Sequence, residues 1–310
     1  MRVAAIDLGT NTTRLLVAEV NAERVEEISR RTTITRLGEG VDERRRLLPL
    51  PIARVRNVLS DYRRELESLG AERTLAVATS AVRDAENGEA FLGEVEWSYG
   101  FTTRLLTGEE EADLTMRGVG EGAADALVVD IGGGSTELIA AGTRISTELG
   151  SVRLTERFLA SEPPTEDELD ALAAAARSVL AEQVPETLSA RRAIGDAGTI
   201  TSLAALDLGL VEYDPGRVHG HQLGDAAVSA QLARLAALPL AERRRVPGLE
   251  PERAPVIVAG AVILREVMHH FGLAAIEASE RDILDGIALE AAALPEPIEG
   301  DAPPGAYTCC

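Results

Sequence analysis

The sequence predicts an α/β protein of two domains. The chain of 310 residues is long enough for two domains of ordinary size. Its 45% apolar and 26% charged residues are typical of a globular protein that buries a real core. Strand-like apolar segments alternate with amphipathic helical ones, and one strand–turn–strand pattern occurs twice, at Val3–Ala18 and at Ala126–Ala141. The repeat indicates a duplicated architecture with one such hairpin in each domain.

The first domain is predicted to span residues 1–121. Apolar and alternating segments predict five strands, at Val3–Asp7, Thr13–Val20, Val25–Thr35, Leu75–Thr79 and Phe101–Leu105. Apolar residues every three or four positions from Ile52 to Leu69 predict an amphipathic helix that Gly70 ends. A further helix is expected at Glu109–Val119, and the glycines that follow mark a domain boundary.

The second domain is predicted to span residues 122–294. After the second hairpin, Thr165–Glu168 has the pattern of a capping box that opens an Ala-rich helix ending near Glu182. Strands are expected at Ala193–Gly195 and 274–278, and helices from Thr199 and at 224–236, 252–270 and 281–293. Residues 295–310 hold four Pro and two Gly and are predicted to form a disordered tail.

Composition excludes several kinds of function. The net charge is −20, and all 31 basic residues are Arg, so the chain has no Lys for a Walker-A phosphate loop or a Schiff base. The acidic balance argues against binding nucleic acid or an anionic membrane. The two cysteines stand together at Cys309 and Cys310, which excludes a disulfide framework. With no signal-peptide pattern and no long apolar window, we expect a cytoplasmic protein.

The internal repeat carries the functional information. VAAIDLGTNTTRLLVA aligns without gaps on ALVVDIGGGSTELIAA, which places Asp7 over Asp130 and Arg14 over Glu137. In each copy an apolar strand ends at an Asp, and a tight turn of small residues leads into a returning strand. The turns comprise Gly9, Thr10, Asn11 and Thr12 in the first copy and Gly132, Gly133, Gly134 and Ser135 in the second.

Turns of this kind can bind phosphate. Glycines let the backbone approach a ligand closely, and successive N–H groups can form a concavity for phosphate oxygens. An Asp cannot bind phosphate directly because both are anionic, but Asp7 and Asp130 can hold a Mg²⁺ ion that the phosphate also touches. The alternative is a pair of ordinary β-hairpins with glycine turns. Two copies in register, each with an Asp in the same place, favour a polyphosphate bound with a metal.

The motifs together resemble a known family. IDLGTNTTRLL, ATSAVRDAEN, TGEEEA and VVDIGGGSTEL, in that order, are similar to the exopolyphosphatase/guanosine-pentaphosphate phosphohydrolase family. That family belongs to the superfamily of actin, sugar kinases and heat-shock ATPases. The resemblance extends to about Leu294, and one departure is Ala197, where the family usually has Gly before Gly198-Thr199.

The resemblance has implications for fold, cofactor and partners. It implies two ribonuclease-H-like (actin-like ATPase) domains, with mixed sheets flanked by helices and an interdomain cleft. It also implies Mg²⁺ or Mn²⁺ as cofactor and inorganic polyphosphate or guanosine penta/tetraphosphate as substrate. A homodimer is expected, with neither nucleic acid nor membrane as a partner.

Carboxylates provide the candidate catalytic and metal-binding groups. The family pattern Gly-x-Glu-Glu-Ala places the catalytic base at Glu110, but helical geometry prevents three successive Glu from facing one cleft. Glu109 and Glu111 therefore stay open as one-residue alternatives, and all three could simply favour a helix N-terminus. The resemblance gives Glu137 a metal or catalytic role beside Asp130, with Asp7 as a third metal candidate. The alternative for Glu137 is an ordinary exposed carboxylate on a strand.

Arginines are the only side-chain cations available for phosphate. A guanidinium can bridge two phosphate oxygens and stays charged at any working pH. The family match places Arg83 on the substrate, and the alternative is an ordinary surface Arg. Arg14 has the same two interpretations, and its strand could also bury it against a carboxylate.

Four functions are consistent with these residues. The leading hypothesis is an exopolyphosphatase, a phosphoanhydride hydrolase that releases terminal phosphate. Guanosine pentaphosphate hydrolysis would use the same site. An ATP-dependent kinase of the superfamily would need an adenosine pocket. A sensor would bind polyphosphate or the guanosine nucleotide without turnover.

Overall fold

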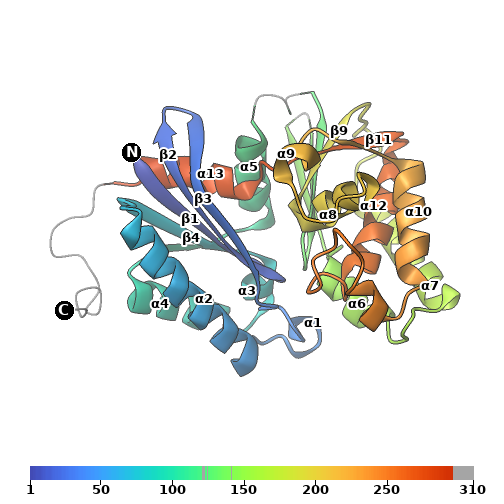
Figure 1. Ribbon diagram of the computed structural model, residues 1–310, viewed down its shortest axis with the longest axis horizontal. Helices are drawn as coiled ribbons and strands as arrows, with labels where there is room; N and C mark the ends of the chain where they lie inside the picture. The colour runs from blue at the N-terminus through green and yellow to red at the C-terminus, as the bar shows by residue number, and fades with distance from the viewer. Residues whose placement is uncertain (121–122, 124, 141, 296–310) are drawn as a thin grey trace. The chain divides into compact units, whose positions relative to one another are not determined.

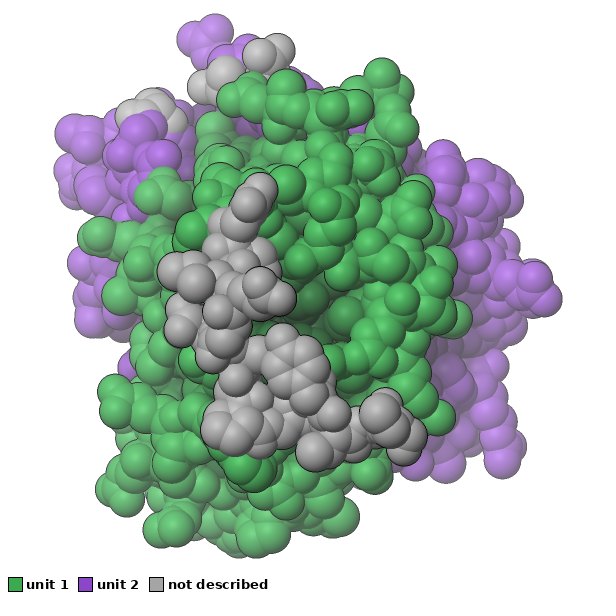
Figure 2. Space-filling model, turned by 90° about the vertical axis from the view of Figure 1, so that its left-hand side faces the viewer, with its two compact units in different colours: residues 1–118, 283–310 green, residues 119–282 purple. Residues whose placement is uncertain are grey.

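The protein folds into two compact units. The computed structural model describes residues 1–120, 123, 125–140 and 142–295 (Figure 1). Unit 1 comprises Met1–Gly118 together with the described residues from Ile283 onward, and unit 2 comprises Val119–Asp282 (Figure 2). The relative placement of the units is not determined, so each is described by itself and the predicted cleft stays a prediction. No helix among the described residues is both long and apolar enough to cross a bilayer.

Unit 1 is built on a five-stranded mixed sheet with the order β3-β2-β1-β4-β5. The first three strands form an antiparallel meander, and β4 and β5 run parallel to β1. The strands are β1 (Arg2–Leu8), β2 (Thr12–Asn21), β3 (Arg24–Ile34), β4 (Arg73–Ala78) and β5 (Thr102–Leu105). All five predicted strands of the first domain are therefore present.

Helices cover both faces of this sheet because β1 is apolar on both sides. Ala4 and Ile6 pack in one cluster with α2 (Pro49–Ser68) and α4 (Gly88–Tyr99). Val3 and Ala5 pack in the other with α5 (Gly108–Val119) and α13 (Ile283–Ala293). This two-residue alternation is the period of a strand buried on both faces. Two short helices, α1 (Val41–Arg44) and α3 (Ser80–Asp84), complete the unit.

The helix α13 departs from the sequence-based division of the chain. That division assigned residues 122–294 to the second domain, but α13 clusters with unit 1. Its Leu284, Ile287 and Ala288 are fully buried against the sheet face that carries Val3 and Ala5. The second segment of unit 1 therefore supplies the helix α13, which covers this apolar face of the sheet. Of the predicted disordered tail, residues 296–310 lie outside the described residues.

Unit 2 repeats the same plan with six strands in the order β10-β11-β9-β6-β7-β8. An antiparallel meander is again followed by strands parallel to its first member, with β10 antiparallel at the edge. The strands are β6 (Leu127–Ile131), β7 (Thr136–Ala140), β8 (Thr143–Thr147), β9 (Ala193–Asp196), β10 (Gln222–Gly224) and β11 (Ala275–Ala278). The two mixed sheets with flanking helices confirm the predicted fold class.

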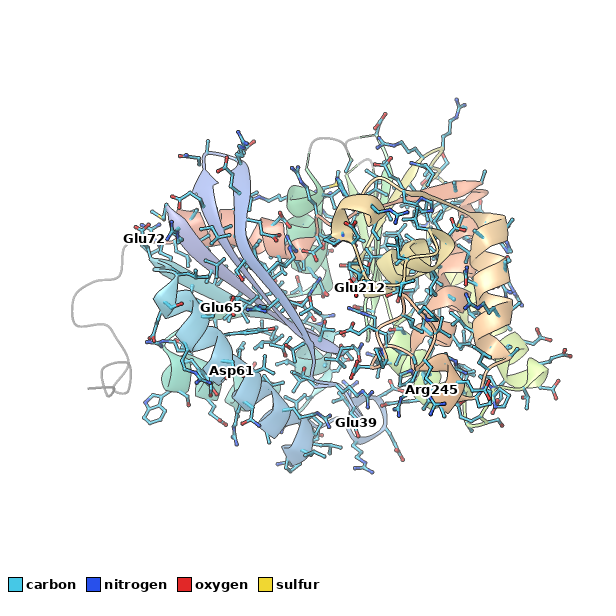
Figure 3. The ribbon with its side chains drawn as sticks, viewed as in Figure 1. Glu39, Asp61, Glu65, Glu72, Glu212 and Arg245 are labelled. Atoms are coloured by element: carbon cyan, nitrogen blue, oxygen red, sulfur yellow. The ribbon has the colours of Figure 1, made fainter. Side chains whose placement is uncertain are left out.

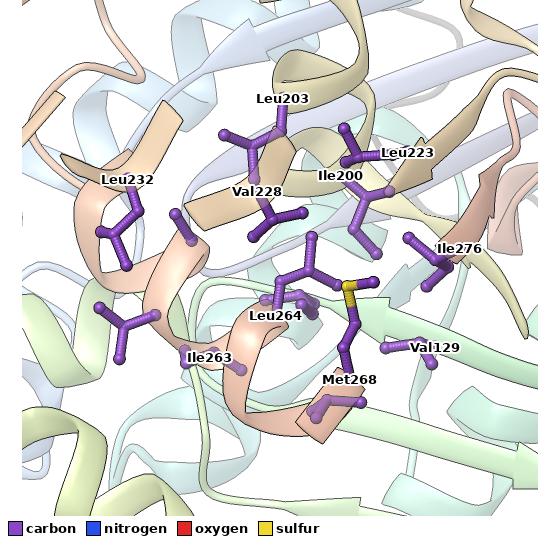
Figure 4. Close-up of a cluster of buried hydrophobic side chains, with 14 of the residues drawn as sticks. Val129, Ile200, Leu203, Leu223, Val228, Leu232, Ile263, Leu264, Met268 and Ile276 are labelled. Carbon is purple, nitrogen blue, oxygen red and sulfur yellow. The ribbon is translucent and has the colours of Figure 1, made fainter. Parts of the chain in front are cut away.

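The helices of unit 2 enclose a large apolar core. They are α6 (Ser151–Phe158), α7 (Glu166–Gln183), α8 (Ala197–Asp207), α9 (Pro215–Val218), α10 (Asp225–Ala236), α11 (Leu240–Arg243) and α12 (Ile257–Phe271). Figure 4 shows side chains of α8, α10 and α12 meeting strand residues such as Val129. The predicted capping box at Thr165 and Glu168 forms with both of its hydrogen bonds. Buried Arg243 donates to three backbone carbonyls, those of Leu235, Leu238 and Ala254.

Candidate active site

The first predicted phosphate loop is the turn between β1 and β2. Gly9 N donates to Thr12 O at 2.9 Å and closes the turn. The next two carbonyls accept hydrogen bonds from the segment that follows β3. Gly38 N donates to Thr10 O, and the amides of residues 35 and 36 donate to Asn11 O, at 2.9–3.0 Å. A Cβ on Gly38 would lie 2.3 Å from the Thr10 methyl group. A glycine is therefore needed where this segment crosses the loop.

Asp7 and Arg14 form a buried ion pair beneath this loop. They occupy the same register position in β1 and β2, and Arg14 Nε and Nη2 lie 2.9 and 2.8 Å from Asp7 Oδ2. The side chains are only 4% and 14% exposed. This matches the alternative in which the strand buries Arg14 against a carboxylate. Arg14 balances the charge of Asp7 in this pair, and the metal-binding role predicted for Asp7 stays a prediction.

A chain of contacts joins the loop to Arg83 and Glu111 within unit 1. Thr10 Oγ1 and Ser80 Oγ are 2.9 Å apart, so the loop meets the first turn of α3. Arg83, on the same short helix, donates from Nη1 to Leu106 O at 2.7 Å and to Glu111 Oε2 at 3.3 Å. Glu111 is 7% exposed. The structure thus brings predicted Thr10 and Arg83 into one network, together with Ser80 and a buried acid.

Glu110 has a structural partner set of its own. Its Oε2 accepts from Thr107 N at 2.8 Å, and Glu110 N donates to Thr107 Oγ1 at 3.2 Å, which is a capping box at the start of α5. Arg104 Nη2 contacts Glu110 Oε1 at 2.9 Å. The hydrogen bond from the Thr107 backbone is the main reason that the pKa of Glu110 is lowered. The same Thr-x-x-Glu pattern that predicted the cap at Thr165 was present here in the sequence.

The second predicted phosphate loop lies between β6 and β7 in unit 2. Gly132 N donates to Ser135 O at 3.0 Å, as Gly9 does in unit 1. The start of α6 donates to all three glycine carbonyls. Ser151 N donates to Gly132 O at 3.0 Å, Val152 N to Gly133 O at 2.8 Å, and Arg153 Nε to Gly134 O at 2.8 Å.

Both loops therefore have their carbonyls held on one side. In a planar trans peptide the C=O of one residue and the N–H of the next point in opposite directions. Where neighbouring segments hold the carbonyls of residues 10–11 and 132–134, the N–H groups of residues 11–12 and 133–135 point the other way. Successive N–H groups on one side form an anion-binding nest. The sequence did not predict the supporting residues Gly38, Gly150 and Arg153.

Three carboxylates share a register position on adjacent strands of unit 2. Asp130 on β6 is paired with Glu137 on β7 and with Asp196 on β9. Paired residues face the same side of a sheet, so these side chains lie on one face. All three are less than 7% exposed, and Ser146 Oγ donates to Glu137 Oε1 at 2.7 Å. Glu137 is therefore not the exposed strand carboxylate of the alternative, and the sequence did not single out Asp196.

These carboxylates allow a test of the predicted metal. Among the described residues, no group of three or more His, Cys, Asp or Glu could hold a metal ion by itself. Mg²⁺, however, is usually bound by one or two carboxylates and completes its shell with water and substrate phosphates. The Asp130–Glu137 pair supplies that kind of hard oxygen donor next to a phosphate nest. The chemistry of these donors is therefore compatible with Mg²⁺, and the metal itself stays a prediction.

The remaining polar positions of unit 2 are mostly structural. Ala197, at the start of α8, has a φ of 61°, the left-handed conformation that glycine prefers. The Arg253 guanidinium lies against Gly198 and would have to move to admit a Cβ there. His219 Nδ1 accepts from Glu280 N at 3.2 Å, and His221 lies 2.8 Å from Asp207. Both histidine side chains therefore have partners within unit 2.

The comparisons with known proteins agree with this geometry. The model of the Ppx/GppA phosphatase family matches residues 16–293. Exopolyphosphatase 2 of Mycobacterium tuberculosis (strain H37Rv) is 38% identical over 318 residues, covering 94% of this chain and 98% of the relative. A crystal structure of the Aquifex aeolicus member of the Ppx/GppA family matches with a TM-score of 0.77 at 32% identity, covering 94% and 98% of the chains.

A solved exopolyphosphatase from Cytophaga hutchinsonii has the same fold. It matches with a TM-score of 0.84 at 25% identity, covering 92% of this chain and 96% of the other. The similarity extends over nearly the full length of each of these proteins. On the family match and the 38% identity, the chain belongs to the Ppx/GppA phosphatase family.

Proposed function

We propose that the protein is a metal-dependent exopolyphosphatase, which hydrolyses the terminal phosphoanhydride bond of inorganic polyphosphate and releases phosphate. The observation that carries the proposal is the pair of loops whose carbonyls accept hydrogen bonds from neighbouring segments. This arrangement would leave the N–H groups of residues 11–12 and 133–135 to form nests for phosphate. The name of the Mycobacterium tuberculosis relative supports the same substrate. Binding through backbone N–H groups needs no basic surface, so it is compatible with the net charge of −20.

We assign the role of general base to Glu111 rather than to Glu110. The two oxygens of Glu110 accept hydrogen bonds from Thr107 and Arg104, and its lowered pKa makes it a weaker base. Glu111 is buried beside Arg83, which is the residue proposed to bind the transferred phosphoryl group. Phosphoryl transfer depends chiefly on positioning and charge stabilisation, so Glu111 would mainly orient the attacking water while Arg83 binds phosphoryl oxygens.

Unit 2 is proposed to bind the metal and further phosphate. Asp130 and Glu137 would hold Mg²⁺ or Mn²⁺, and the nest at residues 133–135 would bind phosphate oxygens. When bound, the metal ion would neutralise negative charge on the phosphates. Ser146 fixes the orientation of Glu137 by its hydrogen bond to Oε1.

Two neighbouring substitutions test the function and the assignment together. Phosphate release from polyphosphate with Mg²⁺ would be measured for the wild type, Glu111→Gln and Glu110→Gln. Loss of a general base lowers kcat by roughly 10²- to 10⁴-fold, and we expect this for Glu111→Gln. Glu110→Gln should keep kcat within a few-fold, and its side-chain oxygen can still accept from Thr107 N, so the helix cap should be retained. Wild-type protein that releases no phosphate from polyphosphate would refute the function, and an active Glu111→Gln variant would refute the base.

Guanosine pentaphosphate hydrolysis is the second candidate. The observation that favours it is the Arg253 guanidinium, which lies beside Gly198 at the start of α8, apart from the glycine loop of unit 2. Arg253 is paired with Glu250 at 2.9 Å, so a second phosphate group would share the guanidinium with that carboxylate. A nucleotide with phosphates on two of its hydroxyl groups presents two separate anionic groups. A competition assay with both substrates decides between them, and Arg253→Gln should raise KM for the nucleotide more than for polyphosphate.

A further inference from the structure

Three consecutive arginines are exposed at the end of α1 in unit 1. They are Arg44, Arg45 and Arg46. Other arginines of this unit are commonly ion-paired, for example Arg30 with Asp285 at 2.7 Å. In the described part of the chain, none of the three forms an ion pair with a carboxylate. A protein with 51 acidic and 31 basic residues offers many acidic partners, so three adjacent arginines without one suggest an anionic ligand.

The backbone that carries these arginines is fixed from both sides. Arg45 has a φ of 52°, and its N–H donates to Val41 O at 2.8 Å, which ends α1. Its carbonyl accepts from Glu86 N at 2.8 Å. The side chain of Asn87 then bonds both Leu47 N, at 2.8 Å, and Leu47 O, at 3.1 Å. The guanidinium groups are thus carried on a turn that the end of α1 and the neighbouring segment Glu86–Asn87 hold in place.

This turn is connected to the first phosphate loop by a short run of hydrogen bonds. Gly38 N donates to Thr10 O at 2.9 Å, and Val41 N donates to Gly38 O at 3.0 Å. The helix α1 that follows has four residues, so it is about 6 Å long. It packs against α3, which carries Arg83 (Figure 1). Glu39, labelled in Figure 3, lies along this path and is neutralised by an arginine of α2 at 2.6 Å.

We propose that Arg44, Arg45 and Arg46 form an accessory binding site for inorganic polyphosphate. The arginine turn would bind phosphates further along the chain than those held by residues 9–12 and Arg83. A guanidinium suits this role because it stays charged and can bridge two phosphate oxygens. The inference rests on the proposed function, and it adds a reason for unit 1 to bind long chains more tightly than short ones.

The accessory site predicts a dependence on chain length. A polyphosphate of many units can contact the loop and the arginine turn together, whereas tripolyphosphate has too few groups to occupy both. Exposed ion pairs contribute modestly, so removing three should raise KM for long polyphosphate roughly tenfold. The value of kcat should stay within twofold of the wild type, because the turn does not touch the reacting phosphate. Added salt should narrow the difference in KM, because it screens exposed charges.

The test compares two triple variants with the same change in charge. Arg44, Arg45 and Arg46 are replaced by Gln in one variant. Arg24, Arg31 and Arg64 are replaced by Gln in the control, since their side chains are 62–78% exposed elsewhere on unit 1. Phosphate release is measured with long polyphosphate and with tripolyphosphate, and thermal unfolding checks that each variant folds. A third variant, with Lys at positions 44–46, restores the charge and should bring KM back close to that of the wild type.

The outcomes separate the inference from the proposed function. A tenfold rise in KM for long chains only, absent in the control variant, supports the accessory site. An unchanged KM, an equal rise for tripolyphosphate or an equal rise in the control overturns it. If the wild type hydrolyses no polyphosphate, the proposed function fails, and binding of labelled long polyphosphate to the same variants tests the site directly. Equal binding by wild type and variant, or no binding by the wild type, then overturns the inference.

Discussion

Replacing Gly150 by Ala tests whether the start of α6 holds the second phosphate loop. Gly150 has φ −117° and ψ 142°, an extended conformation that Ala adopts without strain. A Cβ built there would lie 2.3 Å from Gly133 O and 2.3 Å from the carbonyl carbon of Gly134. Ordinary contact begins at 3.4 Å, so the helix or the loop must move by about 1 Å. Both atoms belong to the backbone, so no side-chain rotation relieves the overlap.

The expected effect of Gly150→Ala has two parts. Overpacking of this kind costs about 1–3 kcal/mol of unfolding free energy, measured by urea denaturation. A displacement of about 1 Å at a catalytic loop can lower kcat/KM about 10²-fold, measured by phosphate release. The matched control is Gly93→Ala in α4, where a Cβ meets nothing within 4 Å, and it should stabilise the protein by about 0.5–1 kcal/mol. A Gly150→Ala variant with wild-type stability and activity would refute the role of α6 as the support of the loop.

Three further predictions concern stability. Ala197→Gly should raise the unfolding free energy by about 1 kcal/mol, because a side chain is sterically unfavourable at a φ of 61°. A lower unfolding free energy, measured by urea denaturation, would contradict this. Arg243→Met should lower the unfolding free energy by about 2–4 kcal/mol in the same assay, because three backbone carbonyls lose their hydrogen-bond donor. An unchanged unfolding free energy would contradict this. The hydrogen bond from the Thr165 backbone lowers the pKa of Glu168 below its ordinary 4.5. Ionised Glu168 therefore stabilises the folded state above pH 4.5, and this stabilisation is lost as the pH falls further. Glu168→Gln should therefore weaken the acid dependence of the thermal midpoint, and an unaltered dependence would exclude this cause.

The sheets could be predicted from sequence because their residues follow simple periods. In β1 the residues from Val3 to Ile6 alternate between two apolar clusters, so this part of the strand is continuously apolar. The gapless repeat then places the same strand as β6 in unit 2, with its turn and returning strand. Both copies form these hairpins because turn and strand signals are local.

The supporting helices could not be predicted in the same way. The helix α6 has only eight residues, which is shorter than the window over which a helical period can be recognised in a sequence. Its position depends on contacts between its backbone and the glycine loop, which no local pattern in the sequence records. The packing of α13 in unit 1 likewise depends on contacts between residues that are far apart in the sequence. For Glu110, by contrast, a local signal existed, because Thr107 stands three residues before it.

The two copies of the repeat differ at one register position, and this difference gives the two hairpins different charges. In unit 1 Asp7 is opposite Arg14, and their ion pair is close to neutral. In unit 2 the equivalent Asp130 is opposite Glu137, so the same strands present two carboxylates on one face. Neighbouring carboxylates are hard oxygen donors of the kind a divalent metal prefers, and an anionic substrate would only add to their negative charge. The exchange of Arg for Glu in the returning strand is therefore the reason we propose the metal site in unit 2 rather than in unit 1.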